Sequence, residues 1–312
     1  MRPRRILVTG AFGFVGRHLV PRLRAAFPEA ALTLCGEEGV GLDIADRAAV
    51  FDLVKAVRPE AVVHLAAISA IGEARRDPER AWRVNVLGTL ALGEALREVV
   101  PEGVMVFASS AEVYGATFKA GVALDEGAVL APMNTYAATK AAADLALGAM
   151  AGDGLRVVRV RPFNHTGAGQ GEGFVVPAFA AQIARAGVRG GRIAVGNLEA
   201  ARDFLDVADV CAAYVACIER DGDWAPGAVF NLASGEARRI GDVLADLVRI
   251  AGVDVEVVSD PARMRASEIP VARGDAGRAR AVLGWAPRVE WAVTLGNVLA
   301  DWRGRVLVED GR

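Results

Sequence analysis

The alternation of short apolar runs with longer amphipathic stretches is the feature that most constrains the fold of this chain. Five aliphatic runs, each bounded by glycine, proline or polar residues, lie at 6–8, 32–34, 61–65, 104–107 and 157–160. Stretches with a helical pattern separate them, at about 14–27, 46–57, 79–99 and 135–150. Strands this apolar suit a parallel sheet covered by helices on both faces. The order predicts an α/β fold with a Rossmann-type, doubly wound parallel sheet and right-handed crossovers.

The pattern becomes less regular after residue 162. A glycine-rich stretch at 165–173 precedes helix-like runs at about 177–187, 207–220 and 240–251, with apolar strand runs at 192–195, 229–232 and 255–258. We expect a smaller α/β domain that is interleaved with the sheet. The dinucleotide-binding domain would comprise 1–163 plus about 203–235, and the substrate-binding domain about 164–202 plus 236–312.

Composition narrows the class of protein. The 36 basic and 38 acidic side chains give a net charge of −2, which argues against a nucleic-acid partner. Three cysteines without a C-x-x-C pair, together with three histidines, argue against a disulfide framework and a metal site. No apolar run reaches the ~18 residues that a membrane helix needs, and no signal peptide is visible. We expect a soluble, cytoplasmic protein with no membrane partner.

A glycine triplet follows the first expected strand. Gly10, Gly13 and Gly16 stand in the segment TGAFGFVGR at 9–17, with the spacing G-x-x-G-x-x-G. The first glycine allows a tight turn, the second lets the backbone approach a pyrophosphate, and the third lets the helix pack on the strand. The helix N-terminus favours phosphate. This predicts dinucleotide binding; a plain strand–turn–helix connection is the alternative.

The end of the second expected strand bears on the choice of dinucleotide. An acid at this tip binds the ribose 2′-OH of NAD, whereas a nearby arginine favours the 2′-phosphate of NADP. Glu37 and Glu38 come slightly late, and Arg17 could reach a 2′-phosphate. We therefore expect NAD(P)H, with NADPH slightly favoured over NADH. Asp43 and Ile44 lie where a short loop could hold the adenine, although a turn or capping role suits Asp43 equally.

Tyr136 and Lys140 form a Y-x-x-x-K pair. On a helix they are one turn apart and share a face. Asn134 would cap that helix. A lysine ammonium near a phenol would lower the phenol's pKa from ~10, so that the tyrosine could exchange a proton with a carbonyl. Ser110, at the end of the fourth expected strand, could donate a hydrogen bond to the same oxygen. An exposed helix face and a turn serine are the alternatives.

With these residues, the chain resembles the extended short-chain dehydrogenase/reductase family, the NAD-dependent epimerases and dehydratases that act on nucleotide sugars. The resemblance covers nearly the full length. It rests on TGAFGFVG (9–16), HLAA (64–67), NVLGT (85–89), SSAEVYG (109–115), YAATK (136–140), RPFNHTGAGQ (161–170), ARDFLDVADV (201–210), DPARMRASE (260–268) and LGWAPR (283–288).

The resemblance implies an oxidoreductase in which Ser110, Tyr136 and Lys140 are catalytic. The segments after residue 160 imply NAD(P)H-dependent reduction of the C4 keto group of a GDP-4-keto-6-deoxyhexose, namely GDP-4-keto-6-deoxy-D-mannose to GDP-D-rhamnose. Glu112 is a further catalytic candidate, because related 4,6-dehydratases carry their base at this place. A GDP-mannose 4,6-dehydratase or a nucleotide-sugar 4-epimerase would use the same set of residues. A dinucleotide or nucleotide-sugar sensor is the non-enzyme alternative.

The resemblance also implies the binding residues. Those for the cofactor are Gly10, Phe12, Gly13, Phe14, Val15, Gly16, Arg17, Asp43, Ile44, Leu65, Ala66, Ala67, Tyr136, Lys140 and Pro162, with His64 beside them and Asn85 as a brace. Those for the substrate are Asn164, Val176, Arg202, Arg265 and Glu268.

Each substrate contact has an alternative. Arg202 would bind the diphosphate, or form a salt bridge with Asp203 or Asp206. Arg265 and Glu268 would clasp the nucleoside, or form a surface ion pair. Asn164 would contact phosphate or stand in a turn. We expect a homodimer through a four-helix bundle formed by the helices around 85–99 and 139–150.

Overall fold

A six-stranded parallel sheet forms the centre of the protein. The computed structural model describes residues 2–187, 190–264 and 269–309. The strand order is β2-β1-β3-β4-β5-β9. The strands are β1 (Arg5–Thr9), β2 (Ala31–Cys35), β3 (Ala61–His64), β4 (Val104–Ala108), β5 (Arg156–Pro162) and β9 (Ala228–Leu232). The order changes direction at β1, so the carboxyl ends of β1, β3 and β4 meet where ligands bind in such sheets. The predicted doubly wound sheet is confirmed.

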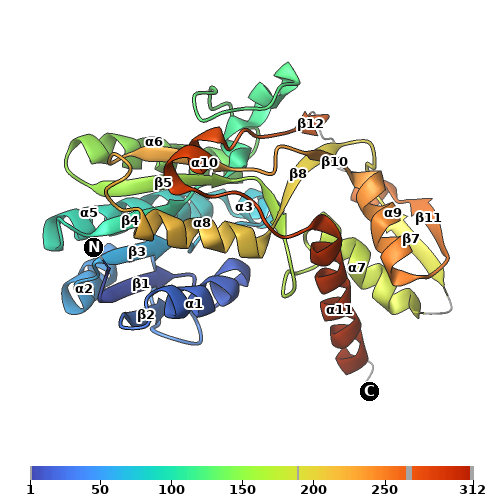
Figure 1. Ribbon diagram of the computed structural model, residues 1–312, viewed down its shortest axis with the longest axis horizontal. Helices are drawn as coiled ribbons and strands as arrows, with labels where there is room; N and C mark the ends of the chain where they lie inside the picture. The colour runs from blue at the N-terminus through green and yellow to red at the C-terminus, as the bar shows by residue number, and fades with distance from the viewer. Residues whose placement is uncertain (1, 188–189, 265–268, 310–312) are drawn as a thin grey trace.

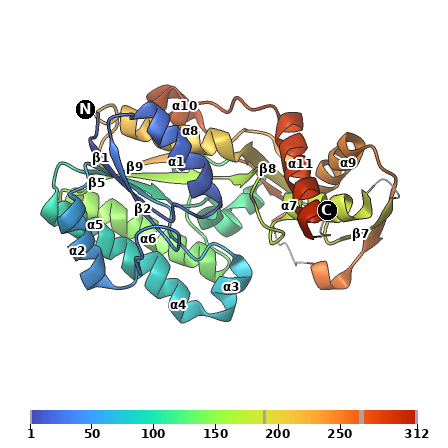
Figure 2. The same cartoon turned by 90° about the horizontal axis from the view of Figure 1, so that it is seen from below.

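Helices cover both faces of this sheet (Figure 2). One layer holds α1 (Phe14–Ala26), α8 (Val207–Glu219) and α10 (Gly277–Leu283), and the other α2 (Arg47–Val57), α5 (Thr89–Val99) and α6 (Thr135–Gly152). Successive strand side chains point to opposite faces. Ile6 and Val8 therefore join the apolar core on one face, whereas Leu7 joins the core on the other.

The predicted helical stretch at 79–99 is interrupted. It consists of α4 (Pro78–Trp82), the π-helical segment η1 (Arg83–Gly88) and α5. Asp77 caps its start by accepting a hydrogen bond from the backbone of Arg80. π-turns are rare and often mark functional sites. Two further short helices that the sequence pattern did not indicate, α3 (Ile71–Arg76) and the 3-10 segment η2 (Ala111–Ala120), flank the carboxyl edge of the sheet.

A second assembly of strands and helices adjoins this edge (Figure 1). Strand β8 (Ala201–Asp206) pairs with β10 (Ala237–Arg239), β12 (Val271–Ala272) and β6 (Asn164–Thr166), and β7 (Gly191–Val195) pairs with β11 (Val255–Ser259). Helices α7 (Val175–Ala186), α9 (Ile240–Ala251) and α11 (Trp291–Glu309) build a separate apolar core, and η4 (Pro261–Arg263) follows β11. The sequence pattern had not indicated β6, β8, β10, β12, α10 or α11.

The predicted domain bounds stay a prediction. Most of the chain after residue 236 packs in the second assembly, whereas α10 packs on α8 and β9 of the large sheet. Among the described residues, no helix combines the length and the hydropathy needed to cross a membrane.

Candidate active site

The glycine loop, residues 9–17, joins β1 to α1 at the carboxyl edge. Gly10 has φ +70°, and a Cβ there would lie 2.8 Å from the backbone nitrogen of Ala66. A Cβ on Gly16 would lie 2.4 Å from the Gly10 carbonyl oxygen, so a side chain would push the helix off the loop. Gly13 is exposed and its Cβ would lie no closer than 3.4 Å to that oxygen. Gly13 is also the N-cap of α1 without a capping side chain, which leaves the first-turn N–H groups for an anion. The loop fits a dinucleotide pyrophosphate.

The apolar side chains of this loop contact neighbouring elements. Phe14 stacks on His165 of β6, with ring centroids 6.2 Å apart. The Val15 carbonyl accepts a long hydrogen bond from the Cys211 thiol of α8, and Phe12 lies beside the turn after β2. The loop therefore touches both β2 and the second assembly.

The Arg17 side chain reaches the turn after β2. Its Nε donates to the Phe12 carbonyl at 2.8 Å, and its guanidinium pairs with the Glu38 carboxylate. Both side chains of this ion pair are more than half exposed, at 59% and 58%. A 2′-phosphate would have to compete with Glu38 for Arg17.

Asp43 and Ile44 have structural contacts. The Asp43 carboxylate accepts a hydrogen bond from the backbone of Ala45 at 2.9 Å, which is a turn contact. Asp46, not Asp43, caps α2. The Ile44 side chain is 6% exposed and belongs to the core. Of the two alternatives for Asp43, the turn role is the one whose contact is seen.

The end of β3 runs beside the glycine loop. Leu65 and Ala66 donate backbone hydrogen bonds to the Thr9 carbonyl and hydroxyl, and Ala67 follows them, half-buried. His64 differs from the expectation that it lines the cofactor. It is 1% exposed, with Nδ1 2.6 Å from the Thr9 hydroxyl and Nε2 2.8 Å from the Thr89 hydroxyl. Burial, with the Lys140 charge, lowers its pKa to about 3, so this ring is a neutral support under the loop.

Ser110, Tyr136 and Lys140 lie together at the end of β4 and the start of α6. Asn134 caps α6 as predicted, since its side-chain oxygen accepts from the backbone of Ala137 at 2.9 Å. The Ser110 hydroxyl lies close enough to the Tyr136 phenol to lower its pKa. The buried Lys140 ammonium donates to the Ala108 carbonyl at 2.7 Å.

The predicted lowering of the Tyr136 pKa is wrong for this arrangement. Burial raises the pKa of Tyr136 to about 12; the Ser110 hydrogen bond lowers it and the nearby Glu112 charge raises it. Lys140 is itself desolvated, and burial lowers its pKa to about 8. The Lys140 ammonium donates to a carbonyl of β4. Tyr136 is thus a protonated phenol at neutral pH.

Asn85, in the π-helical segment, braces the site from behind. Its Oδ1 accepts from the Ile68 backbone at 2.8 Å, and its Nδ2 donates to the Ile68 carbonyl and to the Thr139 hydroxyl. Thr139 lies between Tyr136 and Lys140 on α6. Asn85 therefore ties the segment after β3 to the helix that carries the Tyr–Lys pair.

Glu112 lies near Tyr136, and Asn134 and Arg202 lie near Glu112. The Glu112 backbone donates to the Ser110 hydroxyl at 3.1 Å. The Asn134 side-chain amide lies 3.5 Å from the Glu112 carboxylate. Burial lowers the pKa of Arg202, and the charge of Glu112 opposes that shift. Asp203 accepts from the 234–235 backbone and Asp206 caps α8, while Arg202 itself donates to the Ala201 carbonyl at 2.8 Å.

The other expected substrate and cofactor residues are placed as follows. Pro162 ends β5, and Asn164 starts β6, exposed at the same edge. Val176 is in the first turn of α7 with its side chain buried, so only its backbone could meet a ligand. Arg265 and Glu268 lie outside the described residues.

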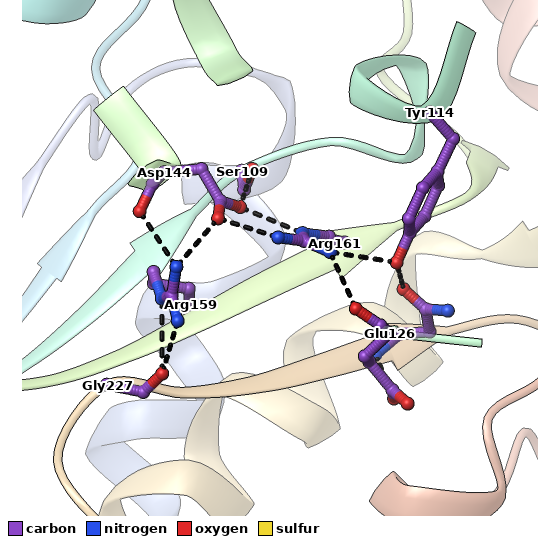
Figure 3. A network of polar contacts seen from close by, with 8 residues as sticks. Ser109, Tyr114, Glu126, Asp144, Arg159, Arg161 and Gly227 are labelled. Atoms are coloured by element: carbon purple, nitrogen blue, oxygen red, sulfur yellow. Dashed lines mark hydrogen bonds and ion pairs between the residues drawn. The ribbon is translucent and has the colours of Figure 1, made fainter. Parts of the chain in front are cut away.

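One buried group under the site was missed from the sequence. Asp144, one turn after Lys140 on α6, binds Ser109, which follows β4, and two arginines of β5 (Figure 3). The available signal was the strand run RVVRVRP, where Arg159 and Arg161 interrupt an otherwise apolar buried strand. Charged residues in such a strand require a buried partner.

Comparison with known proteins agrees with this architecture. A sequence profile of the NAD dependent epimerase/dehydratase family matches residues 6–233. A GDP-6-deoxy-D-mannose reductase of Pseudomonas aeruginosa is 39% identical over 308 residues, 98% of this chain and 99% of the relative. A UDP-glucose 4-epimerase of Streptomyces lividans is 33% identical, over 73% of this chain and 71% of the relative. The solved structure of RMD from Pseudomonas aeruginosa complexed with NADPH has 36% identity and a TM-score of 0.86, over 97% of this chain and 99% of that one.

The chain therefore belongs to the NAD dependent epimerase/dehydratase family, the extended short-chain dehydrogenase/reductases. The predicted family, the Rossmann-type fold and the class of NAD(P)-dependent oxidoreductase are confirmed.

Proposed function

We propose that this enzyme reduces the C4 keto group of a GDP-4-keto-6-deoxyhexose, converting GDP-4-keto-6-deoxy-D-mannose to GDP-D-rhamnose. The observation that carries the substrate class is the whole-length similarity to a GDP-6-deoxy-D-mannose reductase. The grouping of Ser110, Tyr136 and Lys140 beside the glycine loop supports a hydride-transfer site.

The residues of the chain have distinct roles in this proposal. Bound NAD(P)H supplies the hydride for C4. Ser110 and Tyr136 donate hydrogen bonds to the keto oxygen, and Tyr136 gives that oxygen its proton as negative charge develops there. Tyr136 is protonated at neutral pH, so it has a proton to give to the alkoxide, a stronger base, when this forms beside it. Lys140 would hold the nicotinamide ribose.

Substrate recognition is assigned to the edge formed by β6, β8 and α7. Arg202 would bind the diphosphate as a planar donor fork, with Asn164 and the backbone of Val176 beside it. Arg265 and Glu268 would bind the guanine, whose N1–H and amino group are donors that a carboxylate can accept.

We propose that the enzyme prefers NADPH to NADH. The guanidinium of Arg17 on α1 reaches Glu38 in the turn after β2, and the 2′-phosphate of the cofactor would lie near the end of β2. The similarity to a structure complexed with NADPH supports the same choice. Comparison of the dissociation constants of NADPH and NADH tests it.

A second candidate, 4-epimerase or 4,6-dehydratase activity, follows from Glu112. Its carboxylate is close enough to Tyr136 to raise the phenol's pKa, so a base is present beside the proton donor. Both alternative reactions would regenerate the bound cofactor and consume none.

Mixing the protein with GDP-4-keto-6-deoxy-D-mannose and NADPH distinguishes these functions. We expect stoichiometric loss of the reduced-nicotinamide absorbance and formation of GDP-D-rhamnose. Tyr136→Phe should abolish turnover and retain NADPH binding, whereas a sensor would be indifferent to the change. No oxidation with NADPH or NADH would overturn the reductase and leave Glu112 as the next residue to test.

We also propose a homodimer through α5 and α6. Leu145 on α6 and Leu87 on η1, which leads directly into α5, are both 59% exposed, and Trp82 at the end of α4 is 43% exposed. Large exposed apolar side chains on neighbouring elements are typical of an interface. Sedimentation of Leu87→Glu/Leu145→Glu should give a monomer, and an unchanged mass would argue against this surface.

A further inference from the structure

Asp144 is the centre of a buried polar network that joins three elements of the active site (Figure 3). Its carboxylate is fully buried. Oδ2 accepts from the Ser109 hydroxyl at 2.6 Å and from Arg161 Nε at 2.9 Å. Oδ1 accepts from Arg161 at 2.8 Å and from Arg159 at 3.1 Å. Helix α6, the end of β4 and β5 therefore meet at one side chain.

The contact of Asp144 with Ser109 affects the position of Ser110, which acts together with the proton donor Tyr136. Ser109 immediately precedes Ser110, and its backbone donates to the Val160 carbonyl of β5 at 2.8 Å. Its side chain is held by Asp144, which stands on the same helix as Tyr136. The position of Ser110 relative to Tyr136 therefore depends on the Ser109–Asp144 hydrogen bond.

The network extends away from the site without a second carboxylate in contact with its arginines. Arg161 donates to the Tyr114 hydroxyl at 3.0 Å and to the Glu126 backbone carbonyl at 3.3 Å, and Tyr114 donates to Asn231. The Glu126 carboxylate instead accepts from the Asn231 backbone. Among the described residues, Asp144 alone supplies a carboxylate to Arg159 and Arg161.

Lys140 lies one helical turn before Asp144 on the same face. The groups that interact with its ammonium are Asp144 on α6, the neutral His64 on β3 and the Phe107 ring and Ala108 carbonyl of β4. The two arginines that pair with Asp144 stand on β5. Burial lowers the pKa of Lys140, and the charge of Asp144 is what opposes this shift.

We propose that Asp144 is a positioning residue for the reaction. It fixes Ser109, and with it Ser110, relative to the helix that carries the Tyr–Lys pair, and it places a carboxylate one helical turn from Lys140. The inference rests on the proposed function, since Ser110, Tyr136 and Lys140 act on the substrate and cofactor there.

The test compares Asp144→Asn, Asp144→Glu and Ser109→Ala with the wild type. Asp221→Asn is the matched control, because Asp221 pairs with Arg156 of the same strand, at the end remote from the site. The measurements are the pH profile of kcat with GDP-4-keto-6-deoxy-D-mannose, and the pH dependence of NADPH binding followed by nicotinamide fluorescence. Circular dichroism checks that each variant is folded.

In the wild type we expect activity and NADPH affinity to fall above pH about 8, as the Lys140 ammonium loses its proton. Asp144→Asn should move that midpoint down by about one to two pH units, the usual effect of an opposite charge at close range. Asp144→Glu should bring the midpoint most of the way back to the wild-type value, and Asp221→Asn should behave as the wild type. A lower kcat with an unmoved midpoint would overturn the charge role.

Ser109→Ala keeps both ion pairs of Asp144 and tests placement even if Asp144→Asn does not fold. We expect kcat to fall severalfold while the midpoint and the NADPH affinity stay unchanged. A kcat equal to that of the wild type would overturn the placement role. If the wild type itself oxidises no NADPH, the proposed function fails; the fluorescence titration still decides the charge role separately.

Discussion

Two polar centres lie under the same edge of the sheet, and they are built differently. On the glycine-loop side, His64 is a neutral ring held between Thr9 and Thr89. On the serine–tyrosine side, Asp144 is a carboxylate held by Arg159 and Arg161. Both side chains are fully buried, but His64 carries no charge, whereas Asp144 is a charged group held by two others.

The two centres differ in charge because the two sides of the site have different tasks. Under the glycine loop the task is to hold backbone close to a phosphate that the helix N-terminus already attracts, so a neutral support suffices. Under Tyr136 a buried lysine must keep its charge, and burial disfavours charge unless an opposite charge is near. Neutral and charged centres should therefore respond differently to substitution and to pH.

The largest effect is expected at the charged centre. Asp144→Asn leaves two buried arginines without a counter-charge, and breaking such a pair costs about 3–5 kcal/mol of stability. Urea unfolding followed by circular dichroism measures this. Asp221→Asn, at a partly exposed pair, should cost less than about 1 kcal/mol. Equal losses in the two variants would contradict the special status of Asp144.

A smaller effect is expected in the glycine loop above the neutral centre. Gly16→Ala places a Cβ 2.4 Å from the Gly10 carbonyl oxygen, and such overpacking costs about 1–3 kcal/mol. Gly13→Ala meets its nearest atom at 3.4 Å, so stability should change by only about 0.5 kcal/mol. Both should weaken NADPH binding, measured by fluorescence. Normal binding by Gly13→Ala would argue against close approach of the pyrophosphate there.

His64, the neutral centre, should make the stability of the protein depend on pH in acid. His64 has a folded-state pKa of about 3 against 6.5 unfolded, so below pH 6.5 the unfolded chain takes a proton that the folded chain refuses. Its contribution is complete above pH 6.5 and is lost as pH falls toward 3, by about 2 kcal/mol at pH 5. His64→Gln should remove this part of the pH dependence of unfolding. An identical slope in both proteins would disprove it.

The smallest effect is expected at the exposed Arg17–Glu38 pair. Such pairs contribute about 0–1 kcal/mol, so Arg17→Ala should leave the melting temperature almost unchanged. It should nevertheless weaken NADPH binding about tenfold and NADH binding much less, because only NADPH carries the 2′-phosphate. Glu38→Gln should strengthen NADPH binding, since it removes the competing carboxylate. Equal losses for both cofactors would count against a phosphate contact.

The large sheet was predictable because its signals are local. Strand runs such as 6–8 and 104–108 are apolar throughout, and the glycine triplet needs only its own spacing to indicate a phosphate loop. The small sheet was not, because β8 reads ARDFLD, in which no period of hydrophobicity stands out. Its partners β6, β10 and β12 come from distant parts of the chain and are two or three residues long.

By itself the sequence determined the Rossmann-type sheet, the glycine loop and the Ser110–Tyr136–Lys140 set, because strand periodicity and one-turn helix spacing are short-range properties. Only the tertiary structure decided how these groups are charged. Tyr136 keeps its proton because burial outweighs its neighbours, and Lys140 turns to a β4 carbonyl. Asp144 meets Arg159 and Arg161 only where α6 crosses β5, and protonation states depend on such contacts between residues far apart in the chain.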